Sequence, residues 1–362
     1  MKKIAIIGTN GIPSRYGGFE TLAEYLSKYL SDQYDVSVYC SKEHQRIERK
    51  NYNNSKLIYL PFKANGWQSM IYDAVSIFHA YIKSDVLIIL GFSGVIAFPF
   101  KSFFNKKIVF NIGGIEWKKV RGNKTFAVIE VVVKKFFEKV CVYFSDIIVV
   151  DNQVLFDYVK NKYNRDSVLV EYGGDHAVAE PITDEYIRKY PFMSNPYDVT
   201  VARAQEDMNI HLIIDAYKDM PMRNLVVVSN WNSSEYGKDI ISKTRGKYSN
   251  IYLQDAVYDL PELNAIRSNA RLYYHTHSLC GTAPSLTEAM YLGLAVICYD
   301  VDTNRATTEG KSIYFSDITA LKKILFELSE DRIKEICKDM KAIAVKRYTW
   351  CRIVDLYKTC VE

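Results

Sequence analysis

Residues 3–20 have the sequence KIAIIGTNGIPSRYGGFE, which predicts how the fold begins. An apolar run is followed by a turn that contains Gly17 and Gly18, and then by the amphipathic pattern of residues 19–30. We therefore expect a buried strand, a Gly-rich turn and a helix, which together start a βαβ unit.

The Gly-rich turn before this helix suits an anion. Backbone N–H groups and the positive end of the helix dipole would face the anion, and Gly17 and Gly18 would let a phosphate approach the backbone closely. The spacing differs from G-x-G-x-x-G, and Cys40 and Ser41 stand where an acidic residue would bind the ribose of NAD. The turn indicates a phosphate-bearing ligand other than NAD, although an ordinary tight βα turn would contain the same glycines.

Short apolar runs alternate with longer amphipathic stretches along both halves of the chain. Runs that are rich in Val, Ile and Leu throughout are typical of strands covered on both faces, as in a parallel sheet. Both halves are therefore predicted to be doubly wound, Rossmann-like α/β domains. The expected strands are 3–8, 35–40, 56–61, 85–91, 107–111, 146–150 and 167–172, then 198–202, 224–229, 251–254, 270–275 and 295–300.

The boundary between the two halves is predicted at residues 177–196. This stretch follows the Gly-containing turn 172–176 and holds three prolines but no strand pattern, so we interpret it as a linker. The N-terminal domain would then span 1–176 and the C-terminal domain 197–347. Ligands of such sheets bind beyond the carboxyl ends of the strands, which predicts a cleft between the two domains as the site.

The composition excludes several classes of protein. A length of 362 residues favours two domains, and 25% charged with 48% hydrophobic residues indicates a globular protein rather than a disordered one. A net charge of +5 is too small to argue for nucleic acid. The seven cysteines include no C-x-x-C pair, which indicates reduced thiols in a cytoplasmic protein rather than a disulfide framework.

Residues 275–290 have the sequence HTHSLCGTAPSLTEAM and connect an expected strand to an expected helix. The small residues 281–285 would point helix N-terminal N–H groups at a ligand. Glu288, one turn into the helix, could accept hydrogen bonds from two ribose hydroxyls. Ser285 and Glu288 also fit a capping box with Ser285 as the N-cap, and the two roles can coexist.

Three further features concern diphosphate and metal binding. Arg203 follows the first strand of the second half, where a guanidinium suits a diphosphate, although a surface salt bridge would also explain it. His275 and His277 share one face of a strand, but a metal site would need a third ligand, and none is evident. Asp300 and Asp302 could bind a divalent cation or simply solvate a strand end.

Residues 101–139 are both basic and aromatic. Ten Lys and Arg residues against three acids give this stretch a net charge of +7, and the aromatic residues include Phe103, Phe104, Phe136 and Phe137. Basic and apolar side chains on helices can dock on an anionic membrane surface. A helix with one core face and one solvated face would show the same pattern.

Five motifs together resemble rhamnosyltransferase-type enzymes, which are family 4-like GT-B glycosyltransferases of bacterial capsule and O-antigen polysaccharide synthesis. The loop 11–21 resembles their N-terminal signature, and 281–290 resembles their donor loop. The loop 111–118 resembles their acceptor-side loop, and the turn 172–175 resembles the end of their N-terminal domain. The segment from Tyr348 resembles their C-terminal helix, which crosses back onto the first domain.

The resemblance implies a GT-B fold, with two facing Rossmann-like domains, a cleft between them and a C-terminal helix at about 348–362 that returns to the first domain. It implies a retaining transfer of a sugar, rhamnose, from a dTDP- or UDP-linked donor to a saccharide or polyprenyl-linked acceptor, without a metal or other cofactor. By motif position, Arg203 and Glu288 would be the catalytic residues. The donor would also contact Gly17, Gly18, Asn209, His277, Gly281, Thr282, Ser285 and Thr287, and the acceptor would contact Arg15, Glu20, Glu116 and Trp117.

Three positions depart from the family pattern. Cys280 replaces the first glutamate of the E-x7-E motif, Met208 replaces the lysine partner of the diphosphate arginine, and Gly113 stands where the acceptor loop often has His or Asp. Transfer remains feasible, because Arg203 and backbone N–H groups can stabilise the departing diphosphate. Two alternatives stay open. A nucleotide-sugar epimerase of similar fold would need ionisable groups around the sugar, for which Asp175, His176 and Glu116 are the candidates. The three departures would also suit a non-catalytic nucleotide-sugar-binding partner in a polysaccharide complex.

The predicted location is the inner face of the cell membrane. The chain contains no run of 18 or more uncharged apolar residues, so no spanning helix is expected. A protein that acts on a lipid-linked acceptor would then be peripheral, with residues 101–139 as its contact to the anionic surface.

Overall fold

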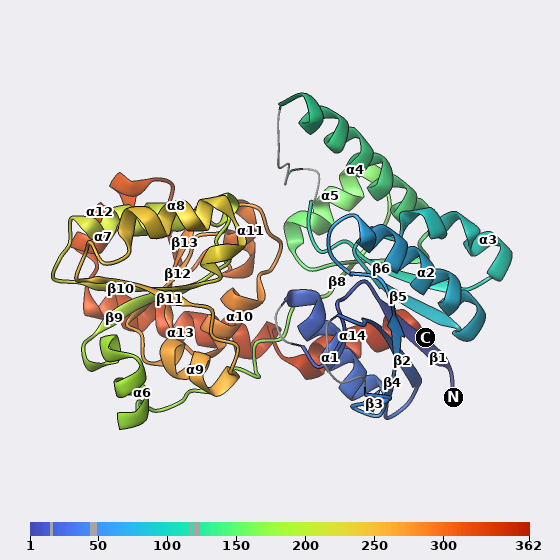
Figure 1. Ribbon diagram of the computed structural model, residues 1–362, viewed down its shortest axis with the longest axis horizontal. Coiled ribbons are helices and arrows are strands. Elements are labelled where there is room, and N and C mark those ends of the chain that lie inside the picture. Colours follow the sequence, from blue (N-terminus) through green and yellow to red (C-terminus); the bar gives the residue numbers. More distant parts are fainter. Residues whose placement is uncertain (15–16, 44–48, 116–117, 119–123) are drawn as a thin grey trace. The chain divides into compact units, whose positions relative to one another are not determined.

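The computed structural model describes residues 1–14, 17–43, 49–115, 118 and 124–362, and the chain divides into two compact units (Figure 1). The first unit comprises Met1–Tyr172 together with Trp350–Glu362, and the second comprises Gly173–Thr349. Each unit is built around its own sheet, so the two predicted Rossmann-like domains are both present.

The sheet of the first unit has eight strands in the order β3-β4-β2-β1-β5-β6-β7-β8. All pairs are parallel except the short β3–β4 hairpin. Every side chain of Val86–Leu90 is buried, as expected of a strand covered on both faces. The strands are β1 (Lys3–Ile7), β2 (Asp35–Ser41), β3 (Asn51–Tyr52), β4 (Ser55–Leu60), β5 (Val86–Leu90), β6 (Lys107–Asn111), β7 (Ile147–Val150) and β8 (Val168–Leu169).

The C-terminal helix α14 (Trp350–Val361) belongs to the first unit although its sequence follows the second. Trp350 stacks on Tyr25 with ring centroids 4.1 Å apart, and Asn111 donates a hydrogen bond to the Tyr357 hydroxyl at 2.7 Å. The buried side chains of α14 thereby join the core of this unit. The other helices are α1 (Gly18–Leu30), α2 (Gln68–Lys83), η1 (Val95–Phe100), α3 (Lys101–Phe104), α4 (Lys124–Phe144) and α5 (Gln153–Tyr163).

The sheet of the second unit has six parallel strands in the order β11-β10-β9-β12-β13-β14. The strands are β9 (Tyr197–Val201), β10 (Asn224–Ser229), β11 (Ile251–Asp255), β12 (Leu272–His275), β13 (Ala295–Tyr299) and β14 (Ile313–Phe315). The helices are α6 (Asp184–Lys189), α7 (Ile210–Lys218), α8 (Glu235–Thr244), α9 (Leu260–Ser268), α10 (Pro284–Tyr291), α11 (Asp302–Thr307), α12 (Ile318–Glu327) and α13 (Glu330–Arg347), with the 3-10 turns η3 (Pro191–Ser194), η4 (Glu206–Met208) and η5 (Trp231–Ser233).

The interpretation of residues 177–196 as a linker is wrong. This stretch contains α6 and η3, and it lies within the second compact unit. Phe192 and Met193 are each 4% exposed and belong to the core of that unit. The prolines suggested a linker, but Pro191 occupies the first position of η3, where the missing N–H costs nothing.

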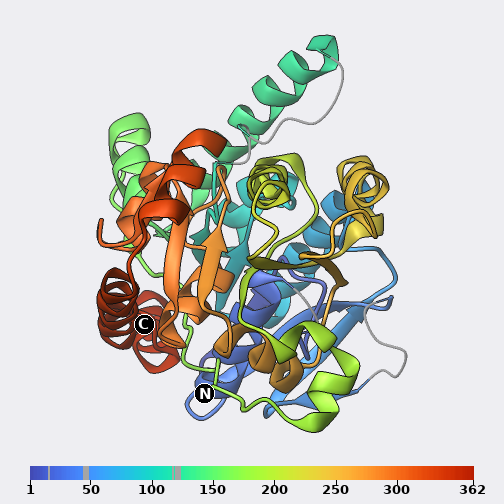
Figure 2. The same ribbon diagram turned by 90° about the vertical axis from the view of Figure 1, so that its left-hand side faces the viewer.

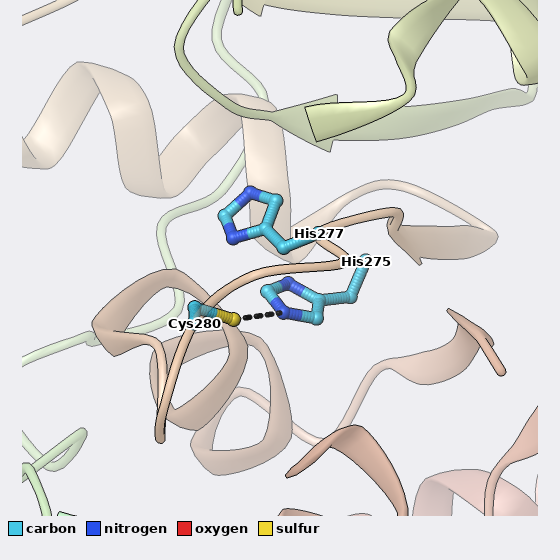
Figure 3. A group of neighbouring side chains, drawn as sticks. All are labelled: His275, His277 and Cys280. Atoms are coloured by element: carbon cyan, nitrogen blue, oxygen red, sulfur yellow. Dashed lines mark hydrogen bonds between the residues drawn. The ribbon is translucent and has the colours of Figure 1, made fainter. Parts of the chain in front are cut away.

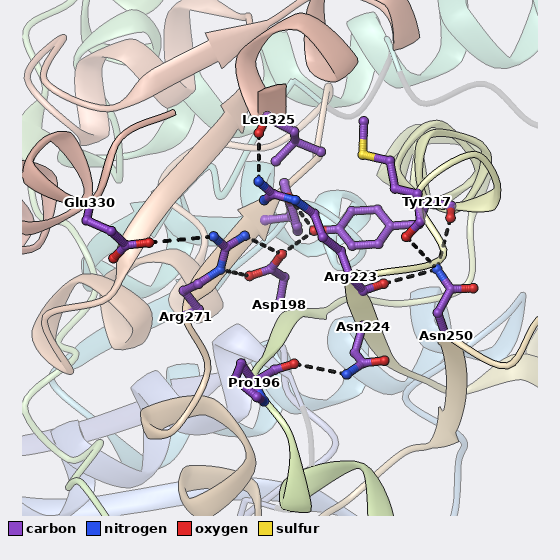
Figure 4. A network of polar contacts seen from close by, with 11 residues as sticks. Pro196, Asp198, Tyr217, Arg223, Asn224, Asn250, Arg271, Leu325 and Glu330 are labelled. Atoms are coloured by element: carbon purple, nitrogen blue, oxygen red, sulfur yellow. Dashed lines mark hydrogen bonds and ion pairs between the residues drawn. The ribbon is translucent and has the colours of Figure 1, made fainter. Parts of the chain in front are cut away.

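A buried polar network stiffens the amino-terminal edge of the second sheet (Figure 4). Asp198, 2% exposed, accepts hydrogen bonds from Nε and Nη2 of Arg271 at 3.1 and 3.0 Å and from the Tyr217 hydroxyl. Asn250 donates to the backbone carbonyl of Tyr217 at 3.0 Å. Asp198 is the second residue of β9, and Arg271 directly precedes β12. This network therefore lies at the amino-terminal edge of the sheet, whereas ligands of such sheets bind at the opposite edge, beyond the carboxyl ends of the strands.

Candidate functional site

The loop from β12 to α10 carries the predicted donor motif. Helix α10 begins at Pro284, and its N-cap is Ala283, which makes no side-chain capping bond. The capping-box interpretation is therefore wrong, because Ser285 lies inside the helix. The Glu288 carboxylate is left to partners outside its own helix.

Glu288 is bound by two basic side chains of the second unit. Nη1 of Arg267 pairs with its Oε2, and Nε2 of His176 donates to its Oε1 at 3.0 Å. Arg267 is fully buried and also donates to Oδ1 of Asn264 at 2.7 Å. Burial acts to raise the pKa of Glu288, but Arg267 and His176 outweigh burial and lower the pKa to about 2. The carboxylate is thus ionised and fixed in orientation.

Gly174, in the turn 172–176, lies too close to α10 for any side chain. A Cβ on Gly174 would lie 2.4 Å from the carbonyl oxygen of Thr287, and the Gly174 N–H donates to the Tyr348 carbonyl at 2.8 Å. Only a residue without a side chain can pass this close to α10. The close approach brings His176, two residues later, to Glu288.

The first strand of the second unit ends at the other predicted catalytic residue. Arg203 follows β9 and is exposed, and within the described part of the chain its guanidinium makes no ion pair or hydrogen bond. The surface salt bridge that could have explained Arg203 is therefore not found among the described residues. The guanidinium remains available to an anion at the carboxyl end of the sheet.

Several predicted donor residues instead support the loop. Asn209 donates to the Thr276 carbonyl at 3.1 Å, which ties the start of α7 to the loop after β12. Met208, which replaces the family's lysine, is 3% exposed and packs in the core. Thr287 is fully buried and its hydroxyl donates to the Pro284 carbonyl at 2.9 Å, so Thr287 belongs to the helix rather than to a ligand surface.

Gly281, Thr282 and Ser285 lie around the start of α10. Gly281 is buried, Thr282 is 2% exposed with its hydroxyl 3.4 Å from that of Thr307, and Ser285 is half-buried. Their backbone surrounds the positive end of the α10 dipole.

Asp300 and Asp302, the two acids considered for a divalent cation, lie outside this loop. Arg305 donates to both oxygens of Asp300 at 2.6 and 2.8 Å, so the Asp300 carboxylate already has a cation as its partner.

Comparison with known proteins identifies the domain that carries this geometry. Residues 183–347 match the family Glycosyl transferases group 1, and residues 1–175 match a domain of unknown function, DUF1972. Residues 183–347 therefore form a group 1 glycosyltransferase domain, and the chain as a whole has the GT-B fold. No curated protein matches its sequence.

Solved GT-B structures share the fold over the whole length of this glycosyltransferase. Sucrose-phosphate synthase from Thermosynechococcus elongatus has 15% identity and a TM-score of 0.82, and Anabaena HepE in complex with UDP-glucose has 15% identity and a TM-score of 0.74, each over 99% of both chains. A glycosyltransferase from Rickettsia africae has 13% identity and a TM-score of 0.71 over 100% of this chain and 99% of its own.

His275, His277 and Cys280 form a cluster at the end of β12 and in the loop that leads to α10 (Figure 3). The two imidazole rings have centroids 4.1 Å apart, and Sγ of Cys280 lies 4.0 Å from Nε2 of His275. Burial lowers the pKa of His275 to about 3, so this ring is neutral. The sequence showed only the two histidines, because the turn after His277 is what brings Cys280 back to them.

In the first unit, Glu20 binds the Gly-rich turn rather than facing a ligand. Its Oε1 accepts hydrogen bonds from the backbone N and the Nδ2 of Asn10 at 3.0 and 2.8 Å, and the residue is 8% exposed. Gly17, the N-cap of α1, has φ 124°, and a Cβ there would lie 2.0 Å from Oε2 of Glu20. Gly18 is the first residue of α1. Glu20 thus supports the Gly-rich turn, and its contact with an acceptor stays a prediction.

Gly113 also has a local explanation. It adopts φ 64°, and a Cβ there would lie 2.3 Å from Cζ of Phe19. The Phe19 ring fills the space that the family's usual His or Asp would need, so this departure follows from packing. The remaining predicted acceptor residues, Arg15, Glu116 and Trp117, lie outside the described residues.

Sequence reasoning missed Arg267 as a partner of Glu288 and considered His176 only for an epimerase. His176 directly follows the turn motif, which could have suggested a role in the site. Arg267 gave no comparable signal, because a single arginine near the end of a helix usually marks a solvated position.

Proposed function

We propose that this glycosyltransferase moves rhamnose from a dTDP- or UDP-linked donor to a saccharide or lipid-linked acceptor in cell-surface polysaccharide synthesis. The observation that carries the proposal is the ionised Glu288 carboxylate, which Arg267 and His176 fix in helix α10 of a group 1 glycosyltransferase domain. The motif resemblance supports rhamnose as the sugar.

The chemistry of the second unit suits a nucleoside diphosphate. Each oxygen of the Glu288 carboxylate retains a free lone pair beyond its present partner, and the side chain is 14% exposed, so Glu288 can accept hydrogen bonds from the ribose hydroxyls. Arg203 would bind the diphosphate as a two-pronged donor. The structure of Anabaena HepE with UDP-glucose supports a donor of this class.

We propose a retaining transfer without a metal. The bond from the acceptor oxygen to the anomeric carbon forms as the bond to the diphosphate oxygen breaks, and the acceptor proton passes to an oxygen of the departing phosphate. Arg203 and the N–H groups at the start of α10 would stabilise the charge that grows on the diphosphate. Chemistry of this kind needs no protein base at Gly113 or Cys280.

The test is a donor panel. We expect UDP or dTDP, and one of their sugars, to raise the melting temperature of the wild type, and Glu288→Ala to lose this shift, because each lost hydrogen bond to a charged group costs about 1.5–3 kcal/mol. Glu235→Ala, at a 90% exposed carboxylate of the same unit, is the control and should bind as the wild type does. A new glycosidic bond supports transfer, an isomerised nucleotide sugar would show an epimerase, and binding without transfer or hydrolysis would show a non-catalytic partner.

We also propose that the first unit docks on an anionic membrane through α4. No helix among the described residues is both long and apolar enough to cross a membrane. Figures 1 and 2 show α4 extending beyond the sheet of its own unit. Its exposed apolar side chains recur on one face and are 40–65% exposed: Val128, Ile129, Val132, Val133 and Phe136.

Lysines on α4 and an exposed phenylalanine on α3 add to this apolar surface. Lys135 and Lys139 are exposed on α4, and each lysine near an anionic surface contributes about 1 kcal/mol. Phe103, 82% exposed, extends the apolar surface to α3. Phe104 and Phe137 do not contribute, because Phe104 stacks on Tyr81 at 5.0 Å and Phe137 packs against the core.

The membrane proposal is tested with vesicles that contain anionic lipid. Phe136→Asp should weaken binding by roughly thirtyfold, since burying a phenylalanine contributes about 2 kcal/mol. The matched control is Phe326→Asp, at an apolar residue of the second unit that is 90% exposed. Equal binding by Phe136→Asp and the wild type at low salt would overturn the docking surface and favour a soluble acceptor.

A further inference from the structure

We propose that His275, His277 and Cys280 bind a thiophilic divalent cation, with Zn²⁺ as the best match. One ligand atom from each residue lies within 4.8 Å of the others, and these three residues are the metal-ligand group found among the residues that the structure describes. The site goes beyond the proposed transfer reaction and does not depend on it.

The donor set identifies the class of metal. Two imidazole nitrogens and one thiolate sulfur are ligands typical of Zn²⁺ and Co²⁺, whereas Mg²⁺ and Ca²⁺ prefer oxygen ligands. Cys280 would release its thiol proton to solvent when the metal binds, because the thiolate is the ligand. Three protein ligands leave the fourth tetrahedral position for water or for an oxygen of a bound molecule.

The distances need only a small adjustment. Zn–N bonds of about 2.0–2.1 Å and a Zn–S bond of about 2.3 Å place tetrahedral ligand atoms about 3.4–3.6 Å apart. Sγ of Cys280 and Nε2 of His275 are already 4.0 Å apart, and the other ligand atoms, which lie within 4.8 Å of one another, must approach by at most about 1.4 Å. Figure 3 shows Cys280 directed at the His275 ring and the His277 ring above it, with the two ring planes tilted by 48°.

Burial of His275 and hydrogen bonds of the loop backbone hold the three side chains in place. His275 is 1% exposed, and its Nδ1 is a buried atom without a hydrogen-bond partner among the described residues. The His277 carbonyl accepts a hydrogen bond from Nδ2 of Asn304 at 3.0 Å, and the Ser278 N–H donates to the Asp207 carbonyl at 2.9 Å. The loop backbone is therefore fixed at residues 277 and 278, between the proposed ligands His275 and Cys280, which lowers the entropic cost of binding.

Cobalt replacement tests the site directly. Adding Co²⁺ to the full-length wild type should give one equivalent of bound metal with a thiolate-to-cobalt charge-transfer band, and added Zn²⁺ should displace it. Cys280→Ser and His277→Ala should lose the band and weaken Zn²⁺ binding by at least about 100-fold, since even outer partners of a metal site contribute about 10–100-fold. Neither variant removes the fully buried His275, so both should fold.

The control is Cys337→Ser, since Cys337 is another partly buried cysteine of the same unit. It should keep the band, and Zn²⁺ should protect Cys280 but not Cys337 from alkylation. Absence of the band in the wild type would overturn the proposal. A band that survives in Cys280→Ser would also overturn it, because the cobalt would then be bound elsewhere.

Discussion

Replacing Arg267 by alanine tests the arrangement at Glu288 most directly. Arg267 is fully buried, and its guanidinium pairs with a carboxylate that is 14% exposed. The variant leaves that carboxylate with His176 as its remaining basic partner. We expect both the stability of the second unit and the affinity for a nucleoside diphosphate to fall.

The magnitude follows from the pKa of Glu288. A shift from 4.5 to about 2 corresponds to about 3 kcal/mol in favour of the ionised form, and removal of one partner of a buried pair costs about 3–5 kcal/mol. We therefore expect Arg267→Ala to lower the free energy of unfolding by about 3 kcal/mol near neutral pH. The lower end of the range applies because water can reach the carboxylate in part.

The pH dependence has a defined sign. Because the pKa of Glu288 is depressed in the folded state, its contribution is fully present above pH 4.5 and is lost as the pH falls toward about 2. Without Arg267, burial dominates and raises the pKa, so the carboxyl takes up a proton at higher pH. The difference in stability between variant and wild type should then be largest near neutral pH and shrink in acid.

The assay is urea unfolding of Arg267→Ala, Glu288→Ala and the double variant at several pH values. We expect a coupling energy of about 2–3 kcal/mol between the two positions. Arg245→Ala is the control: Arg245 forms an exposed pair with Asp255 at 3.1 Å, which should contribute less than about 1 kcal/mol. Additive effects, or a loss below 1 kcal/mol that does not vary with pH, would refute the reasoning.

Three further predictions concern other groups. Burial raises the pKa of Asp73 to about 7, so its contribution to stability is full below its ordinary pKa of 3.8 and is lost as the pH rises through 7. Asp73→Asn should accordingly stabilise the protein by up to about 4 kcal/mol at pH 8, while thermal melts near pH 4 should match the wild type. Arg203→Lys should bind UDP or dTDP nearly as poorly as Arg203→Ala in calorimetry, because a point charge replaces a two-pronged donor, and full retention of affinity in the lysine variant would contradict this. Transfer should persist in EDTA, and activity that is lost there and restored by Mg²⁺ or Mn²⁺ would show that the proposed metal-free departure of the diphosphate is wrong.

The sequence by itself determined the two Rossmann-like domains. The apolar run of residues 85–91 predicted a buried strand, and the structure has β5 at Val86–Leu90. Such patterns are read correctly because the alternation of apolar runs and amphipathic stretches is a local property of the chain. Short elements such as β14, with three residues, carry too little pattern to be predicted. The donor motif at 281–290 was likewise a local pattern, and its role in binding a donor stays a prediction.

Only the tertiary structure decided which side chains complete the site. Glu288 is separated from Arg267 by 21 residues and from His176 by 112, and neither spacing leaves a periodic signal. Gly113 is explained by the ring of Phe19, and Cys280 joins His275 only through the turn of the loop. The physical reason is that burial, and with it the cost of leaving a charge or a polar atom unpaired, is set when distant segments pack together. The chain's local pattern specifies the strands and helices, whereas the packing of these elements determines the partners of a buried carboxylate.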